Sequence, residues 1–388
     1  MLRTISRLFC IFSLLACGLL AGCDQSGATK DKDSKTSATD NRPLRLVSLS
    51  PALTQMITDM GHGNLIVGVD DSHAMVFDKL DVPTVGQYSA VSAEMLIGLK
   101  PTHVLVMAGQ EGPPAALAQQ SEANGFKVIT FAVPTNVREV IGILVGKYVP
   151  PTAGSESVTT DTSLAGLLGD DRGGLHVANE MQRQLGRIAE LADSASEPGK
   201  RPRVLVAFAV EPRVQASGPD TVLDDVLRQY AGAYNAAIPE LKPISNAELD
   251  RITDPEKRKA AMLAATEDPE KRVGTAPTFD RERLLESKPE VVLLILPGAE
   301  PLLAIDDDPR LADFRGLDIP AVKNNRIVLI SDKTALLPST GLPAVAAQMA
   351  KAIHPALAAR IDQIIAPPTP TVPEDGADKK EPVAIEPK

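Results

Sequence analysis

Two stretches of the chain repeat one order of apolar strands and helices, and this repeat constrains the fold more than any other feature of the sequence. Each stretch opens with an apolar run, a short turn and a helical pattern. The paired elements are the strands 44–49 and 203–208, the helices 52–60 and 221–230, the strands 104–107 and 291–296, the strands 127–131 and 326–330, and the final helices 137–148 and 344–353. Continuous apolar strands that alternate with helices predict parallel sheets covered on both faces.

The segment 175–193 lies between the two stretches and has the spacing of an amphipathic helix. Met181, Leu185 and Ile188 recur at intervals of three and four residues, with charged residues between them. This spacing predicts one long helix. We therefore expect two Rossmann-like α/β lobes joined by a single long helix. The ligand cleft should lie between the lobes, at the loops that follow the carboxyl ends of the strands.

The remaining segments are polar and mark the boundaries of the lobes. Residues 366–388 are rich in Pro and charged residues, which predicts a disordered tail. The resulting expectation is an N-terminal lobe over 43–149, a polar insert over 150–174, a connecting helix over 175–197, and a C-terminal lobe over 198–365 that contains a second polar insert at about 238–277.

The N-terminus has the pattern of a lipoprotein signal. Arg3 and Arg7 precede the apolar run 8–20, which is too short to span a bilayer, and the run ends in Leu-Leu-Ala-Gly-Cys23. This pentapeptide resembles a bacterial lipobox. We expect a signal peptide over 1–22, lipidation of Cys23 and a flexible tether over 23–42. The chain would then lie in the cell envelope outside the cytoplasm, anchored to a membrane. The alternative is an ordinary signal peptide with an incidental cysteine.

The composition excludes several classes of function. A formal net charge of −10 disfavours binding to nucleic acid. No cysteine follows Cys23, so the mature chain has none for a disulfide, a zinc site or a thiol nucleophile. The sequence contains no HExxH, no GxSxG and no phosphate-binding lysine loop, and its five histidines are scattered. We therefore expect no catalytic residues, no metal site and no resident cofactor.

A short motif marks the same place in each half. Glu94 precedes Pro101 by seven residues, and Glu282 precedes Pro289 by the same spacing. In both halves a helical pattern lies between the two residues and an apolar strand follows. A glutamate in the first turn of a helix also interacts favourably with the helix dipole, so this position alone leaves a purely structural role open.

Several segments, taken in order, resemble the substrate-binding proteins that serve ABC importers of cobalamin, haem and ferric siderophores. The matching segments are 45–54, 67–70, 85–89 and 94–101 in the first half and 203–208, 216–219, 222–226, 282–289 and 319–328 in the second. The resemblance implies a monomeric binding protein that works with an ABC permease and its ATPase. It also implies that Glu94 and Glu282 dock the two lobes onto arginines of the two permease subunits.

The resemblance and the order of strands together suggest ligand-binding residues. We expect contacts from Ser50 and Pro51 after the first strand, from His73, Tyr88 and Gln110 in later loops of the same lobe, and from Arg213 in the second lobe. His73 could instead be a solvated loop residue. Arg213 could instead pair with Glu211.

The small-molecule ligand follows from the resemblance alone. A corrinoid is the first expectation, and haem or a ferric siderophore is the second. Cobalamin-binding members commonly flank the corrin with Trp and Tyr, whereas this sequence contains no Trp and only four Tyr. The rival function is that of an envelope lipoprotein which uses the same fold as a sensor or assembly scaffold, without transport.

Overall fold

The computed structural model describes residues 42–77, 81–109, 112–146, 163–196, 200–239 and 275–365. Residues from Pro43 onward form one compact unit, and this unit is the subject of the description below. Several predicted features lie outside the described residues: the signal peptide, Cys23, Gln110, most of both polar inserts and the tail. Among the described residues, no helix has both the length and the hydropathy needed to cross a membrane.

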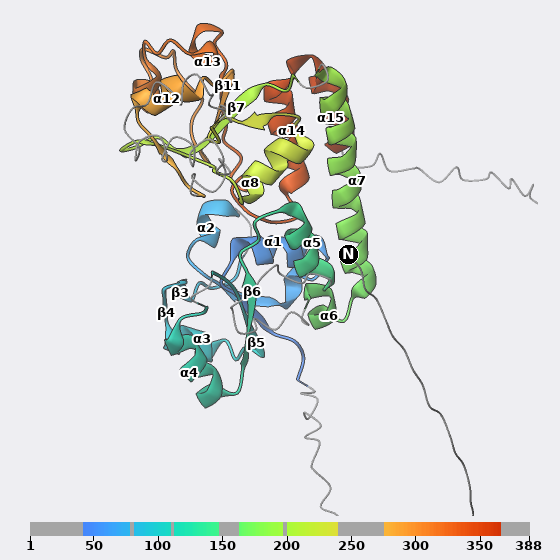
Figure 1. Ribbon diagram of the computed structural model, residues 1–388. Coiled ribbons are helices and arrows are strands. Elements are labelled where there is room, and N and C mark those ends of the chain that lie inside the picture. Colours follow the sequence, from blue (N-terminus) through green and yellow to red (C-terminus); the bar gives the residue numbers. More distant parts are fainter. Residues whose placement is uncertain are drawn as a thin grey trace, which may run out of the picture. The chain divides into compact units, whose positions relative to one another are not determined.

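The N-terminal lobe contains a four-stranded parallel sheet in the order β2–β1–β5–β6 (Figure 1). This arrangement confirms the predicted alternation of buried strands and helices. The elements of this lobe are β1 (Leu46–Ser48), α1 (Pro51–Asp59), η1 (Gly63–Leu65), β2 (Ile66–Val69), α2 (His73–Val76), β3 (Gly86–Gln87), β4 (Ala90–Val91), α3 (Ala93–Gly98), β5 (His103–Ala108), α4 (Ala115–Asn124), β6 (Lys127–Ala132) and α5 (Val137–Val145).

The C-terminal lobe repeats this order and adds antiparallel strands. The strands β9, β7, β11 and β12 are parallel neighbours, as β2, β1, β5 and β6 are in the first lobe. The elements are β7 (Arg203–Ala209), β8 (Val214–Ala216), α8 (Val222–Asp225), η2 (Val226–Tyr230), β9 (Tyr234–Asn235), β10 (Thr278–Phe279), α12 (Arg281–Ser287), β11 (Val291–Ile295), η3 (Pro309–Phe314), α13 (Pro320–Lys323), β12 (Ile327–Ile330), α14 (Leu342–Ile353), η4 (Pro355–Leu357) and α15 (Ala358–Ile365).

The second sheet contains the predicted parallel strands and also two antiparallel pairs that the sequence pattern did not predict. β8 pairs antiparallel with β7, and β10 pairs antiparallel with β8. The reason is a short connection, because only four residues separate β7 from β8 and a parallel crossover needs a dozen or more. The chain therefore reverses after Ala209 and extends the sheet before its first helix.

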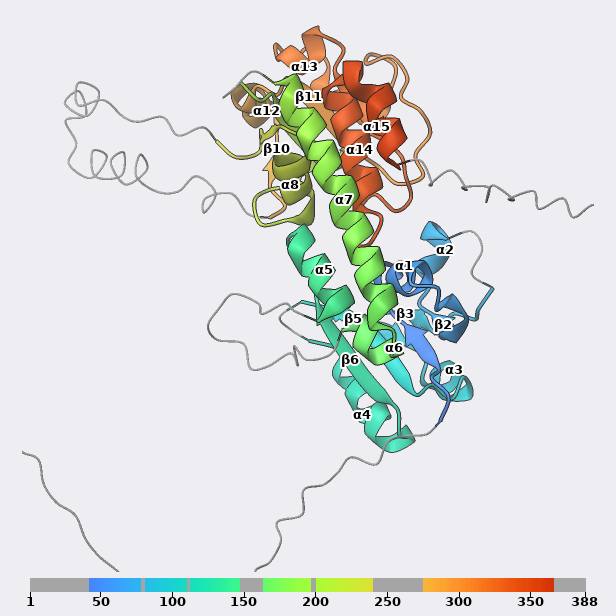
Figure 2. The same ribbon diagram turned by 90° about the vertical axis from the view of Figure 1, so that its right-hand side faces the viewer.

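One long helix, α7 (Asp171–Ala195), connects the lobes. Figures 1 and 2 show α5 and α6 (Leu164–Leu168) against its first half and α14 and α15 against its second half, in agreement with the contacts between these helices. The helix begins four residues before the predicted start, within the span assigned to a polar insert. Asp170 explains the difference, because its side chain caps the helix by accepting a hydrogen bond from Gly173 N at 2.8 Å.

Successive side chains along each central strand point into two different cores, one on each face of the sheet. Leu46 and Leu105 of the first sheet and Val206 and Leu293 of the second belong to a single core with the buried face of α7. Their neighbours along each strand point to the opposite face, where α3 and α4 cover the first sheet and α12 and α13 cover the second. The shared core links both lobes to one helix, and this link suits small lobe motions better than wide opening.

Candidate functional site

Hydrogen bonds join the two lobes beside the carboxyl ends of their strands. On α1, Gln55 Oε1 accepts from Ser339 Oγ at 2.6 Å and Asp59 Oδ2 accepts from Thr340 Oγ1 at 2.5 Å. The helix α1 follows β1, whereas residues 339–340 follow β12 and precede α14. Both bonded segments therefore lie downstream of strand ends, and the candidate ligand site is the region between these two sheet edges.

A second link lies at the start of α5, which follows β6. The backbone N–H of Val137 donates to Asp225 Oδ2 of α8 at 2.9 Å. Burial raises the pKa of the Asp225 carboxyl, and the Val137 N–H opposes part of this rise. Burial also raises the pKa of Asp59 at the first link, against a lowering effect of its bond from Thr340. Both links thus contain a carboxylate that loses hydration where the lobes meet.

His73 differs from the expectation of a solvated or ligand-accessible loop residue. It is the first residue of α2 and is only 2% exposed. Its Nδ1 lies 2.6 Å from Asp70 Oδ1, and its Nε2 lies 2.5 Å from Thr54 Oγ1 on α1. Ser72 Oγ also donates to the Asp70 carboxylate at 2.8 Å. Because both ring nitrogens have protein partners, the side chain orients the loop after β2 and has no free nitrogen for a ligand.

Thr54 and Asp70 were not among the residues expected at the site. The polar run from Asp70 to His73, directly after a buried strand, is a signal that could have identified Asp70. The spacing of three residues lets the Asp70 carboxylate meet the imidazole within one turn. Thr54 lacks such a signal, because it is 19 residues away in the sequence and meets His73 only in the fold.

Tyr88 lies in the loop between β3 and β4 and is partly buried. Its hydroxyl donates to Gly112 O, in the loop after β5, at 3.4 Å. This distance is longer than is usual for a hydroxyl donor, so the bond is weak and a ligand can replace it with little loss of free energy. Burial raises the pKa of the phenol, which keeps it protonated at neutral pH. The structure thus places Tyr88 beside Gly112, whereas Gln110 lies outside the described residues.

Ser50 and Pro51 lie at the start of α1, after β1. Pro51 occupies the first helical position, and Ser50 is the residue before the helix. The Ser50 side chain makes no capping bond, whereas its carbonyl oxygen accepts from Ser48 Oγ at 3.0 Å. Pro51 has no N–H, so a backbone donor toward a ligand at this turn has to come from Ser50 or from the residues after Pro51.

Arg213 lies in the short connection between β7 and β8 and is exposed. Within the described part of the chain it forms no ion pair and no hydrogen bond, so the predicted alternative of pairing with Glu211 is not observed. Its position at the carboxyl end of β7 is equivalent to that of Ser50 and Pro51 after β1. The guanidinium is therefore free to bind a carboxylate or phosphate.

Glu94 and Glu282 lie in the first turns of α3 and α12, and both are exposed. Other side chains cap these helices: Ser92 Oγ accepts from Met95 N at 3.4 Å, and Asp280 Oδ1 accepts from Arg283 N at 2.9 Å. Among the described residues, neither glutamate accepts a hydrogen bond or pairs with a cation. The carboxylates are thus available to a partner, and helix capping does not explain them.

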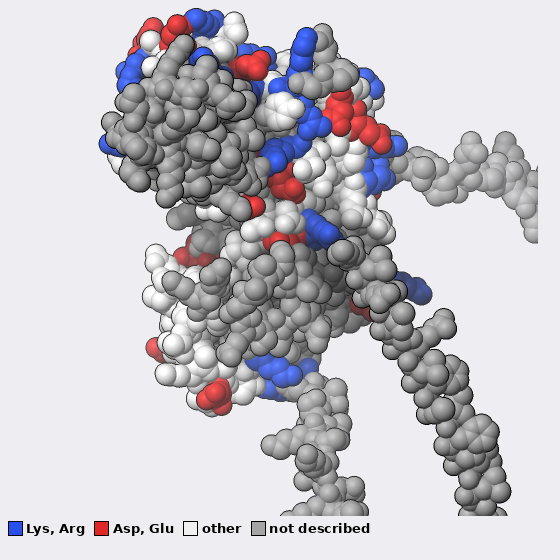
Figure 3. Space-filling view, in the orientation of Figure 1, with Lys and Arg blue, Asp and Glu red and all other residues white. Residues whose placement is uncertain are grey.

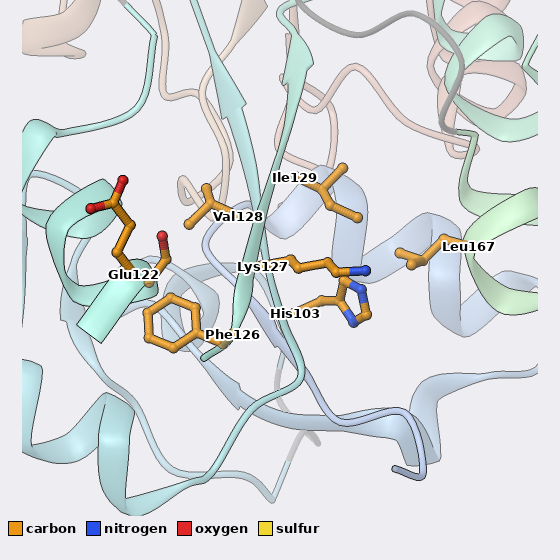
Figure 4. A pocket seen from close by; sticks show the side chains of 8 residues that line it. His103, Glu122, Phe126, Lys127, Val128, Ile129 and Leu167 are labelled. Atoms are coloured by element: carbon orange, nitrogen blue, oxygen red, sulfur yellow. The ribbon is translucent and has the colours of Figure 1, made fainter. Parts of the chain in front are cut away.

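A hollow of about 600 Å³ lies along β6, away from the candidate ligand site. Figure 4 shows His103, Lys127, Ile129 and Leu167 on one side of the strand and Glu122, Phe126 and Val128 on the other. His103 and Lys127 begin β5 and β6, so the hollow is at the amino ends of the strands. Ligand loops of parallel sheets lie at the carboxyl ends, and the hollow is therefore not our candidate site.

Charged side chains and potential metal ligands are dispersed over the described residues. On the face shown in Figure 3, Lys and Arg alternate with Asp and Glu and form no continuous basic patch among the described residues. In the same ranges, no three His, Cys, Asp or Glu side chains converge in a group that could hold a metal ion.

The comparisons with known proteins all find binding proteins of the periplasmic or ABC-transporter type. A family model described as periplasmic binding protein matches residues 46–254. The uncharacterized ABC transporter substrate-binding lipoprotein YvrC of Bacillus subtilis is 24% identical over 240 residues, which cover 58% of this chain and 70% of that protein.

Two solved structures share the fold over most of their length. The periplasmic haem-binding protein RhuT from Roseiflexus sp. RS-1, in its apo form, is 23% identical with a TM-score of 0.56 and covers 81% of this chain and 98% of that one. A periplasmic haem-binding protein from Pseudomonas aeruginosa is 20% identical with a TM-score of 0.58 and covers 81% and 94% of the two chains.

Proposed function

The chain belongs to the periplasmic binding protein family, and from that premise we propose that it captures a metal-containing tetrapyrrole outside the cytoplasm and delivers it to an ABC importer. Members of this family are binding proteins, which confirms the expectation of no enzymatic role. One observation supports the proposal above the others: the carboxyl edges of the two sheets face each other, and the hydrogen bonds Gln55–Ser339 and Val137–Asp225 connect the lobes there. Loops from both lobes, with Tyr88 on one and Arg213 on the other, follow these edges.

Haem is the ligand that these side chains support best, ahead of the corrinoid that the sequence alone suggested. Haem carries two carboxylates, and the exposed Arg213 guanidinium is a suitable partner for one of them. The Tyr88 phenol is an oxygen donor for ferric iron, and coordination would release its proton. The absence of Trp removes the side chain that commonly flanks a corrin. The names of the two similar structures also support haem.

Titration of the purified mature chain with haemin, cyanocobalamin and a ferric siderophore tests this proposal. We expect saturable binding of haemin, with a shifted Soret band, and much weaker binding of the other two. Tyr88→Phe should shift the Soret band again, since it removes the oxygen donor. Arg213→Gln should weaken haemin binding about tenfold, as expected for the loss of a charged pair.

Arg187→Gln is the matched control, because Arg187 is an exposed arginine on α7 away from the sheet edges. It should leave haemin affinity unchanged. Tight binding of cyanocobalamin or the siderophore instead of haemin would replace the ligand but keep the importer function. Failure of all three ligands to bind would refute the tetrapyrrole proposal.

The cellular position is part of the same proposal. We infer that Cys23 becomes the lipidated N-terminus and holds the chain at a membrane, with residues 23–42 as the tether. The lipobox-like pentapeptide supports this, as does the lipoprotein name of the Bacillus subtilis relative. Glu94 and Glu282 would then dock the lobes on the permease, because both carboxylates are exposed and have no partner among the residues that the structure describes.

A further inference from the structure

The helices α3 and α12 match each other residue by residue, beyond the two glutamates. Each has a capping residue two positions before the glutamate, a buried leucine two positions after it and a large exposed aliphatic residue three positions after it. In each half a lysine at positive φ lies six positions after the glutamate. These pairs are Ser92 and Asp280, Leu96 and Leu284, Ile97 and Leu285, and Lys100 (φ 48°) and Lys288 (φ 43°).

Both helices also have the same place in their sheets. The helix α3 leads into β5, which lies between β1 and β6, and α12 leads into β11, which lies between β7 and β12. They therefore stand at the amino ends of the central strands, whereas the ligand loops follow the carboxyl ends. A surface formed by these helices can bind a partner without contacting the ligand.

Ile97 and Leu285 are 42% and 39% exposed, although each is a large aliphatic side chain. Leu96 and Leu284 are fully buried and hold the two helices against their sheets. Residues three apart share one face of a helix, so Ile97 lies beside Glu94 and Leu285 lies beside Glu282. Each lobe thus presents a free carboxylate next to an apolar side chain.

We propose that Ile97 and Leu285 are apolar anchors of the permease-docking surface, each inserting into an apolar socket beside the basic residue that pairs with Glu94 or Glu282. This inference rests on the proposed importer function. Within the described residues the two carboxylates have no cation partner, so a basic residue of the permease can pair with each of them. An apolar contact beside the pair excludes water, and exclusion of water strengthens the attraction between the charges.

The occupant follows from charge and duplication. Each of the two helices occurs once in the chain, so the partner has to present two matching sites, one for Glu94 and Ile97 and one for Glu282 and Leu285. A pair of membrane subunits that both present a basic residue beside an apolar socket fits two matched tips. The permease of the importer is therefore the partner to which the inference commits.

Photo-crosslinking from the full-length chain locates the partner. A photo-reactive amino acid is placed at position 97, 285 or 175 in cells that express the importer. Leu175 is the control, because it is also an exposed aliphatic residue on a helix, at 50% exposure on α7. We expect adducts with the permease subunits from positions 97 and 285 and none from position 175. Adducts of the chain with itself, or equal permease adducts from all three positions, would overturn the inference.

Affinity for the permease–ATPase complex in nanodiscs tests the energetic role. The double change Ile97→Gln, Leu285→Gln should raise the Kd about tenfold or more, while Leu175→Gln should change it less than about twofold. Thermal unfolding of each variant should match that of the parent chain, because the three side chains are exposed.

The double change Glu94→Gln, Glu282→Gln separates this inference from the proposed function. If it weakens docking and the Ile97, Leu285 variant does not, the apolar anchors are wrong and the importer function stands. If neither double variant weakens docking, α3 and α12 do not form the docking surface; failure of the parent chain itself to bind the permease–ATPase complex would refute the importer function.

Discussion

The backbone N–H of Val137 in the N-terminal lobe donates to the carboxylate of Asp225 in the C-terminal lobe at 2.9 Å. The bond connects the first residue of α5 to α8, and burial raises the pKa of the carboxyl. A raised pKa means that the folded state favours the protonated acid. The stability that Asp225 contributes is therefore greatest below its unfolded pKa of 3.8 and is lost as the pH rises through the folded value.

Asp225→Asn should flatten the dependence of stability on pH, because the amide oxygen still accepts from Val137 N and carries no charge. We expect the free energy of unfolding of this variant to be at least that of the parent chain at neutral pH. Asp225→Ala removes the acceptor and should cost about 1–3 kcal/mol. Denaturant unfolding at a series of pH values checks both. A lower stability of the Asn variant at neutral pH would show that the charge itself holds the lobes.

His73 should contribute to stability through its two partners. His73→Ala leaves the buried Asp70 carboxylate and the Thr54 hydroxyl without their shared hydrogen-bond partner, which should cost about 1–3 kcal/mol. The double change Asp70→Ala, His73→Ala should cost less than the sum of the two single changes, since the residues act together. Chemical denaturation of the three variants measures this coupling. Additive effects would contradict the network.

Asp308 should make the C-terminal lobe sensitive to acid. The Arg310 side chain holds the pKa of this buried carboxyl well below its usual range, and the backbone N–H groups of Leu303 and Arg310 add to the effect. A lowered pKa means that the contribution is complete above the unfolded value of 3.8 and is lost as the pH falls below it.

Asp308→Asn should therefore lower the free energy of unfolding by about 2–3 kcal/mol at neutral pH and remove most of the acid sensitivity below about pH 4. Asp318→Asn is the control, because Asp318 is 77% exposed in its ion pair with Lys323 and should matter little. Denaturant titrations between acid and neutral pH distinguish the two variants. Equal losses in both would refute the assignment to Asp308.

The arrangement of the sheets follows from local sequence. Continuous apolar strands separated by helices predict the parallel pairs, and the 3.6-residue spacing of Met181, Leu185 and Ile188 predicts the connecting helix to within four residues. The matched spacing of Glu94 and Glu282 also predicts two equivalent helix starts, which the structure contains. Each of these features depends on residues close together in the chain.

Contacts between distant segments leave no such pattern. Gln55 and Ser339 meet although they are 284 residues apart, and His73 is buried because α1 brings Thr54 to it. The loop around His73 is short and polar, so the sequence favours exposure until the fold supplies partners. The apolar anchors Ile97 and Leu285 were missed for the opposite reason, since an aliphatic residue in a helix normally predicts burial.

Cys23 lies outside the described residues, and its lipidation is tested most directly in cells. Cys23→Ser should move the protein from the membrane to the soluble envelope fraction or leave the precursor unprocessed. Metabolic labelling with a fatty acid, followed by fractionation, measures this. Undiminished labelling of the variant would show that another residue carries the lipid.

Glu94 and Glu282 should be required for transport and dispensable for ligand capture. An exposed ion pair contributes only about 0.2–1 kcal/mol, whereas truncating one partner of a dehydrated pair in an interface costs about 2–5 kcal/mol. The double change Glu94→Ala, Glu282→Ala should therefore abolish uptake in reconstituted vesicles and leave haemin affinity intact, because α3 and α12 stand at the opposite sheet edge from the ligand loops.

Uptake and haemin titration are measured on one preparation. The double change Asp171→Ala, Glu190→Ala, at two exposed positions on α7, is the control for the loss of two negative charges. Normal uptake by the Glu94, Glu282 variant, or loss of haemin binding with it, would show that these glutamates do not dock the lobes.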